Sequence, residues 1–88
     1  MPHVVLPRSL IALFPGAPRR SEVADVATVG DLIGRLDASW PGLADRLCDV
    51  GPVLREYINV YVDGERADLA TPLGPDAVVH VLPAVAGG

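Results

Sequence analysis

Residues 28–40 read TVGDLIGRLDASW, and they carry the clearest secondary-structure signal in the chain. Thr28, followed three residues later by Asp31, matches a capping box with aspartate in place of the usual glutamate. The apolar residues recur at helical spacing and form one stripe: Val29, Leu32, Ile33, Leu36 and Trp40. Pro41-Gly42 cannot continue a helix. The stretch therefore predicts one amphipathic helix that begins after Thr28 and ends near Trp40.

The segments on both sides of this helix have the patterns of short β-strands. The strongest is Tyr57 to Val62, where small aliphatic residues alternate with Tyr57, Asn59 and Tyr61. Asp63-Gly64 is a two-residue hairpin signal, so residues 65–67 are expected to return beside this strand. Further strands are expected at 3–6, 19–23 and 78–82, and a further helical turn at 43–47.

One helix with one apolar stripe covers one face of one sheet. The pattern therefore predicts an α+β chain with a β-grasp, or ubiquitin-like, fold: a mixed sheet of about five strands over one main helix. The domain is expected to span residues 1–82, followed by a flexible extended tail at 83–88. The expected core is Val4, Leu6, Val29, Leu32, Ile33, Leu36, Ile58, Val60, Val62, Val79 and Val81. A ferredoxin-like fold is the alternative, but it needs a second helix, and residues 41–52 contain too many breakers to supply one.

Length and composition exclude several classes of function. The 88 residues suffice for a single small core, and the formal net charge of −4 argues against a nucleic-acid partner. All seven cations are arginines, so the chain has no lysine for a Walker-type phosphate loop. Cys48 is the single cysteine and is expected to be a small buried hydrophobe, with a reactive thiol as the alternative.

Metal and membrane sites are not expected either. The two histidines, His3 and His80, lack the spacing of a metal site. The sequence shows neither a signal peptide nor an apolar run of the roughly 20 residues that a membrane helix needs. A cytoplasmic protein without a metal, without a bound cofactor and without a membrane partner is expected.

The last residues read Leu82-Pro83-Ala84-Val85-Ala86-Gly87-Gly88. Glycine has no Cβ, so Gly87 and Gly88 can pass through a channel too narrow for other residues, and they leave a terminal carboxylate unshielded. Six extended residues reach roughly 20 Å, enough to enter the active site of another protein. The tail therefore predicts a carboxylate that a partner activates at Gly88.

Three segments resemble the prokaryotic ubiquitin-like sulfur carriers, the family of the thiamine sulfur carrier, the small subunit of molybdopterin synthase and the carrier for thiocarboxylate-dependent cysteine synthesis. The segments are the tail at 81–88, the strand and turn at 58–65 (INVYVDGE), and the stretch at 40–47 (WPGLADRL). The Leu-Pro-Ala-Val-Ala-Gly-Gly form of the tail is most similar to the cysteine-synthesis carrier.

The resemblance implies a defined chemistry at the tail. A partner adenylating enzyme, using its own ATP and Mg²⁺, joins AMP to Gly88, and a sulfurtransfer step converts the glycine to a thiocarboxylate. The tail residues that would thread into the partner are Pro83, Ala84, Val85, Ala86 and Gly87. In the cysteine pathway the thiocarboxylate attacks an aminoacrylate on a pyridoxal-phosphate enzyme, and a metallopeptidase later frees the new cysteine. The chain would thus be a protein co-substrate and not an enzyme.

A carrier also needs a docking face. The sheet face away from the helix is expected to present Tyr57, Asn59, Tyr61, His80 and Leu82, together with Val78. Exposed tyrosines and aliphatic residues are typical of protein interfaces. Arg55 and Arg66 are candidates for steering a partner by charge.

The sequence is also compatible with other functions. The chain could be the small subunit of molybdopterin synthase, a carrier for tRNA thiolation or for sulfur in natural products, a ubiquitin-like protein modifier, or an interaction domain whose tail is inert.

Overall fold

The structure is a computed structural model that describes residues 1–83. It contains three helices: α1 (Arg8–Ile11), α2 (Val29–Ser39) and α3 (Leu43–Leu47). Its strands are β1 (His3–Val5), β2 (Arg20–Glu22), β3 (Cys48–Asp49), β4 (Val53–Leu54), β5 (Ile58–Val62), β6 (Glu65–Ala67) and β7 (Val78–Pro83).

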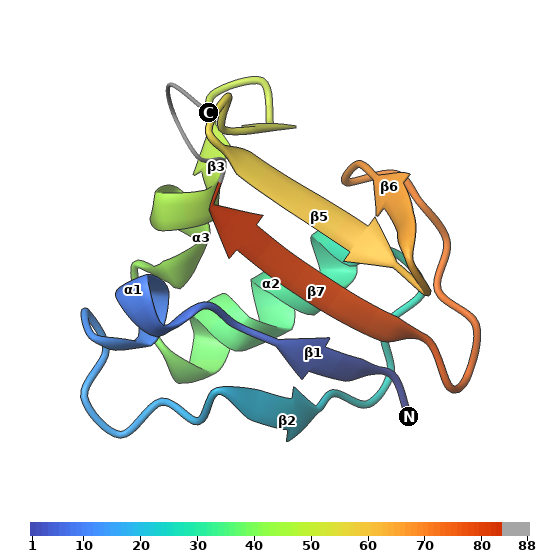
Figure 1. The fold of residues 1–88 in the computed structure, drawn as a ribbon, viewed down its shortest axis with the longest axis horizontal. Helices are drawn as coiled ribbons and strands as arrows, with labels where there is room; N and C mark the ends of the chain where they lie inside the picture. Colours follow the sequence, from blue (N-terminus) through green and yellow to red (C-terminus); the bar gives the residue numbers. More distant parts are fainter. Residues whose placement is uncertain (84–88) are drawn as a thin grey trace.

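Five strands form one mixed sheet in the order β2-β1-β7-β5-β6. The central strands β1 and β7 are parallel, and the other neighbours are antiparallel. Figure 1 shows these strands in front of α2, which crosses behind them. A mixed five-stranded sheet over one main helix is the β-grasp arrangement, so the predicted fold class is confirmed.

The helix α2 begins and ends where the sequence predicts. The Thr28 hydroxyl oxygen accepts a hydrogen bond from the Asp31 backbone N–H at 3.1 Å. In return the Asp31 carboxylate accepts from the N–H of Ala27, the residue before the N-cap, at 3.1 Å, so the capping box closes one residue earlier than its usual form. At the other end the Trp40 N–H donates to the Leu36 carbonyl at 2.8 Å.

The chain then turns directly into α3. Gly42 takes the left-handed conformation, with φ of +97°, as the N-cap of this short helix. The Asp37 carboxylate of α2 accepts hydrogen bonds from the backbone N–H groups of Gly42 and Ala44 at 3.1 and 3.0 Å. This aspartate therefore joins the two helices, and the predicted extra turn at 43–47 is confirmed.

The core lies between α2 and the inward face of the sheet. Nine of the eleven predicted core residues are buried, but Ile58 and Val62 are only half-buried and pack against the edge of the core. The physical reason is their position: Ile58 lies opposite Pro83 and Val62 lies opposite Glu65, at the two open ends of β5. Five further aliphatic residues are buried that were not predicted in the core: Leu10, Val23, Leu43, Leu47 and Ala77.

The hairpin predicted at Asp63-Gly64 is also confirmed. Both residues have positive φ, +50° and +86°, and the flanking residues Val62 and Glu65 pair across the turn. Positive φ at both central positions is typical of the tight turns that join twisted strands. No helix within residues 1–83 has the length and apolar composition needed to cross a membrane.

Candidate functional site

The outward face of the sheet gathers four of the residues predicted to dock a partner. Across the β5–β7 pair, Tyr61 lies opposite His80 and Asn59 lies opposite Leu82. Residues opposite one another in a ladder point to the same face. The intervening Val81 of β7 is buried, so these four side chains point away from α2.

Tyr57 lies outside β5, contrary to the predicted strand start, and immediately precedes Ile58. Its side chain is 58% exposed. Because Ile58 pairs with Pro83, the last residue of β7, Tyr57 lies at the end of the sheet from which the chain leaves β7. Pro83, predicted as the first tail residue, is thus paired in the sheet. The predicted tail positions Ala84, Val85, Ala86, Gly87 and Gly88 lie outside the described residues.

Three further strands add residues to this face: Val5 and Arg20, which were not predicted to lie there, and Arg66, which was predicted only as a charge that steers a partner. Val5 of β1 lies opposite His80 on one side and opposite Arg20 of β2 on the other. On the far side of β5, Arg66 of β6 lies opposite Tyr61. We call the row formed by Arg20, Val5, His80, Tyr61 and Arg66 the cross-sheet row.

Arg20 and Val5 were missed for different reasons. Residues 19–23 alternate too weakly to show which side chains point outward. Val5 joins the site only through the parallel pairing of β1 with β7, which are at opposite ends of the chain. The β-grasp topology itself was the available signal, because it places the first and last strands side by side.

At the Tyr57 end of the sheet lies a groove of about 550 Å³, lined by Gly42, Asp45, Arg46, Arg55 and Tyr57. Within it the Arg55 side chain donates two hydrogen bonds to the Asp45 carbonyl, at 2.9 and 2.7 Å, and lies 3.5 Å from the Asp49 carboxylate. The Arg55 backbone also accepts from the Ile58 N–H at 2.9 Å. Arg55 therefore holds the approach to β5 against the end of α3, so its guanidinium is occupied by this internal role.

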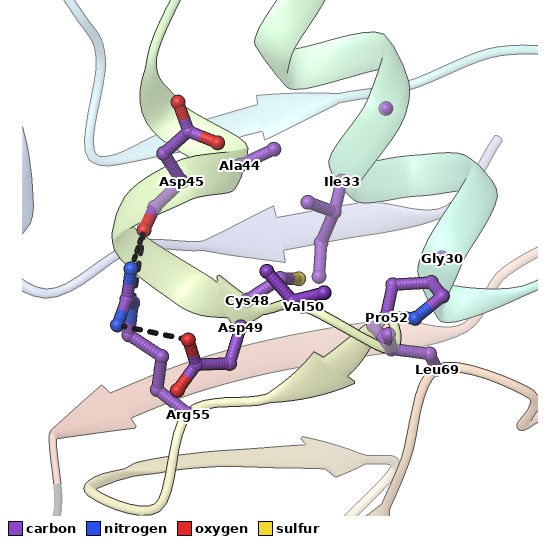
Figure 2. Close-up of a pocket in the computed structure, with 11 residues that line it drawn as sticks. Gly30, Ile33, Ala44, Asp45, Cys48, Asp49, Val50, Pro52, Arg55 and Leu69 are labelled. Carbon is purple, nitrogen blue, oxygen red and sulfur yellow. Dashed lines mark hydrogen bonds and ion pairs between the residues drawn. The ribbon is translucent and has the colours of Figure 1, made fainter.

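A second cavity, about 460 Å³, lies between α2, α3 and the β3–β4 hairpin, and Figure 2 shows the residues that line it. Cys48 and Ile33 both line it, and Cys48 packs against the hydrophobic core. Burial raises the pKa of the Cys48 thiol; the Arg55 charge opposes this shift and the Asp45 charge adds to it. Cys48 is half-buried, so the prediction of a buried residue is only partly confirmed, but a neutral thiol against aliphatic carbon behaves as a small hydrophobe.

The two histidines share the outward face. His80 lies opposite Val5, two residues along β1 from His3. The Nε2 of His3 lies 3.6 Å from a carboxylate oxygen of Glu22 in β2. Within residues 1–83, no three His, Cys, Asp or Glu side chains are grouped so that they could hold a metal ion.

Comparison with known proteins identifies relatives along almost the whole chain. The sequence model of the ThiS family matches residues 7–88. Small archaeal modifier protein 3 of Haloferax volcanii is 41% identical over 70 residues, which cover 75% of each chain. The sulfur carrier protein CysO of Mycobacterium tuberculosis is 36% identical over 76 residues, which cover 80% of this chain and 82% of CysO.

A solved structure agrees with the fold. One chain in the crystal structure of the BexX/CysO complex from Amycolatopsis orientalis is 30% identical and matches with a TM-score of 0.87, covering 100% of both chains. The relatives are named as a sulfur carrier and as a protein modifier, and neither name is that of a catalyst.

Proposed function

The chain belongs to the ThiS family of ubiquitin-like sulfur carriers, and we propose that its C-terminal glycine, Gly88, is the group on which sulfur is carried. One observation carries the proposal: the family match begins at residue 7 and continues through residue 88, so it includes the diglycine. The chain is thus a protein co-substrate, and catalysis belongs to its partners.

The chemistry follows from the weakness of a carboxylate as an electrophile. A partner adenylating enzyme would join AMP from ATP to the Gly88 carboxylate and release pyrophosphate. A sulfur nucleophile from a sulfurtransfer step would then attack the activated carbonyl carbon and displace AMP, which leaves a thiocarboxylate. ATP and Mg²⁺ are substrates of the partner in this scheme. Enclosure in a partner's active site would protect the thiocarboxylate from water.

The tail and the outward face would have separate roles in binding the partner. Ala84, Val85, Ala86 and Gly87 would thread through the partner's channel, where the small side chains and the glycine keep the chain narrow, while Pro83 stays paired with Ile58 at the end of β7. Tyr57, Asn59, Tyr61, His80 and Leu82 would form the docking surface. Support for this surface is its position: it runs along β7 to Pro83, directly before the tail.

The proposed acceptor is a pyridoxal-phosphate enzyme of cysteine synthesis. The thiocarboxylate sulfur would attack an aminoacrylate held on that enzyme, and a metallopeptidase would later release cysteine from the carrier. The 36% identity to the sulfur carrier CysO supports this assignment.

The decisive experiment is the intact mass of the chain after co-expression with the host's adenylating enzyme, a sulfur source and ATP. We expect one oxygen atom to be replaced by sulfur at Gly88. The matched control is a variant extended by one alanine, which should gain no sulfur while the alanine is retained. Equal sulfur loading of the extended variant would contradict the proposal.

A second test addresses the docking surface. Tyr61→Ala removes an aromatic ring from its centre, and loss of such an anchor typically weakens a protein complex by more than 1 kcal/mol. We expect the KM for the carrier in the adenylation reaction to rise roughly tenfold. Arg35→Ala, on the exposed side of α2, is the control and should leave KM unchanged.

Protein modification is a second candidate, because small archaeal modifier protein 3 is 41% identical to this chain. In that case Gly88 would form an isopeptide bond with lysines of target proteins. Mass spectrometry of host proteins for Gly-Gly remnants on lysine, compared between the host and a strain lacking this chain, separates the two functions.

A further inference from the structure

The cross-sheet row ends in an arginine at each edge of the sheet. Arg20 lies on the edge strand β2 and Arg66 on the opposite edge strand β6. Both residues are exposed. Between them the row presents Val5, His80 and Tyr61, all of them half-buried. The outward face therefore has a largely apolar and aromatic centre with a fixed positive charge on each flank.

This charge pattern contrasts with the rest of the molecule. The whole chain has a formal net charge of −4. Among the outward-pointing residues of the five-stranded sheet, within residues 1–83, Glu22 is the only acidic one, and its carboxylate lies 3.6 Å from the His3 Nε2. Within residues 1–83 neither Arg20 nor Arg66 forms an ion pair, whereas Arg55 is bonded to Asp45 and Asp49. The two flanking guanidinium groups are thus available to an incoming carboxylate.

The register also fixes the spacing of the two charges. From β2 to β6 there are four steps between neighbouring strands. Each step is about 4.8 Å, so the two arginine backbones lie roughly 19 Å apart. An arginine side chain can form two parallel hydrogen bonds with a carboxylate, which gives the contact a defined direction.

We propose that the adenylating enzyme presents an apolar strip flanked by two acidic residues roughly 19 Å apart, which pair with Arg20 and Arg66. This inference rests on the proposed function, because it assigns the face to the partner that activates Gly88. The strip packs on Val5, His80 and Tyr61.

The two charges at the ends of the row restrict rotation of the carrier on its partner, which an apolar patch alone does not. Apolar contacts are non-directional, so a patch alone leaves the carrier free to rotate on its partner. The row runs across the strands, while the chain leaves β7 along the strands at Pro83. Pairing at both flanks therefore fixes the rotation that aims the tail at the catalytic site. Flanking charges also speed encounter and reject partners of the wrong charge.

The test measures direct binding to the host's adenylating enzyme by calorimetry, without ATP, so that it is independent of sulfur loading. Arg20→Glu and Arg66→Glu should each weaken binding roughly tenfold and the double variant roughly a hundredfold, with a flatter salt dependence. The matched control is Arg35→Glu, which makes the same charge change on α2 behind the sheet and should have little effect. Circular dichroism verifies that each variant is folded.

Each outcome is decisive. The inference is supported if only the two sheet variants lose affinity for the enzyme. It also requires that affinity is restored when the acidic residue of the enzyme that faces the reversed arginine is itself changed to arginine. Equal losses in all three variants, no loss in any, or no binding of the parent chain would overturn it. The proposed function is judged separately, by the mass of the parent chain after loading.

Discussion

The surroundings of Cys48 determine how readily its thiol ionises. Burial raises the pKa of its thiol, so less thiolate is present at a given pH than in a free cysteine. We expect iodoacetamide to alkylate the folded chain more slowly at pH 8 than the chain unfolded in urea. The pH at which half of the maximal rate is reached should lie above the value of roughly 8.5 for an unperturbed thiol.

The same shift has a consequence for stability. A thiol with a higher pKa in the folded chain keeps its proton longer there, so its ionisation favours unfolding. Its contribution to the free energy of unfolding is complete below the unfolded pKa and is lost as the pH rises through the folded pKa. In urea titrations, the free energy of unfolding of the parent should therefore fall relative to that of Cys48→Ala as the pH rises above about 8.5. A constant difference between pH 7 and pH 10 would contradict this expectation.

Gly42 and Gly34 form a matched pair for the effects of a single methyl group. A Cβ at Gly42 would lie 3.7 Å from Phe14, an ordinary contact, but φ is +97°. Gly42→Ala should therefore cost about 1–2 kcal/mol through backbone strain alone. A Cβ at Gly34, inside α2, would meet no atom within 4 Å, so Gly34→Ala should stabilise the chain by about 1 kcal/mol. Thermal unfolding of both variants checks the opposite signs.

The stability of α2 depends on the hydroxyl at its start. Thr28→Ala removes the acceptor for the Asp31 N–H and should lower the free energy of unfolding by about 1 kcal/mol. For a chain of this length that corresponds to a fall in Tm of roughly 4–8 °C. Thr28→Ser keeps the oxygen and serves as the control. Equal Tm values for the alanine and serine variants would show that the cap contributes nothing.

Local signals explain why some elements could be predicted and others could not. The cap at Thr28, the stripe along α2 and the breaker at Pro41 lie within a few turns of one another, so the sequence alone defines this helix. By contrast α1 has four residues and β3 has two, which is too short for any periodicity. Burial of Leu10 in the core holds α1 in place, and β3 follows directly on Leu47, the buried last residue of α3.

The residues of the candidate site likewise differ in whether local sequence predicts their position. The alternation of Asn59 and Tyr61 with buried aliphatic residues predicts which side chains of β5 point outward. The pairing of Tyr61 with Arg66 follows from the two-residue turn at Asp63-Gly64, whereas the pairing of Tyr61 with His80 depends on a strand register that arises only when the sheet assembles. Arg20 requires in addition the position of β2 at the edge, so neither its face nor its distance from Arg66 was accessible from the pattern.

In the molecule as a whole, the parts that maintain the fold and the part proposed to react are separate in sequence. The described core runs from Val4 to Val81, and the pairing of β7 with β5 extends to Pro83. The family match continues to residue 88. The proposed reaction at Gly88 therefore involves a residue outside the described core.

This separation predicts the effect of removing the last five residues. A chain ending at Pro83 retains the five-stranded sheet and the described core, so its Tm should lie within about 2 °C of the Tm of the parent. This is less than the shift of roughly 4–8 °C that a loss of about 1 kcal/mol would cause. It should still bind the adenylating enzyme through the outward face, although more weakly, and it should gain no sulfur. Calorimetric unfolding, binding and intact mass measure the three properties on one sample. If the shortened chain instead unfolds at a markedly lower temperature, residues 84–88 stabilise the fold and the proposed division between scaffold and reacting tail is wrong.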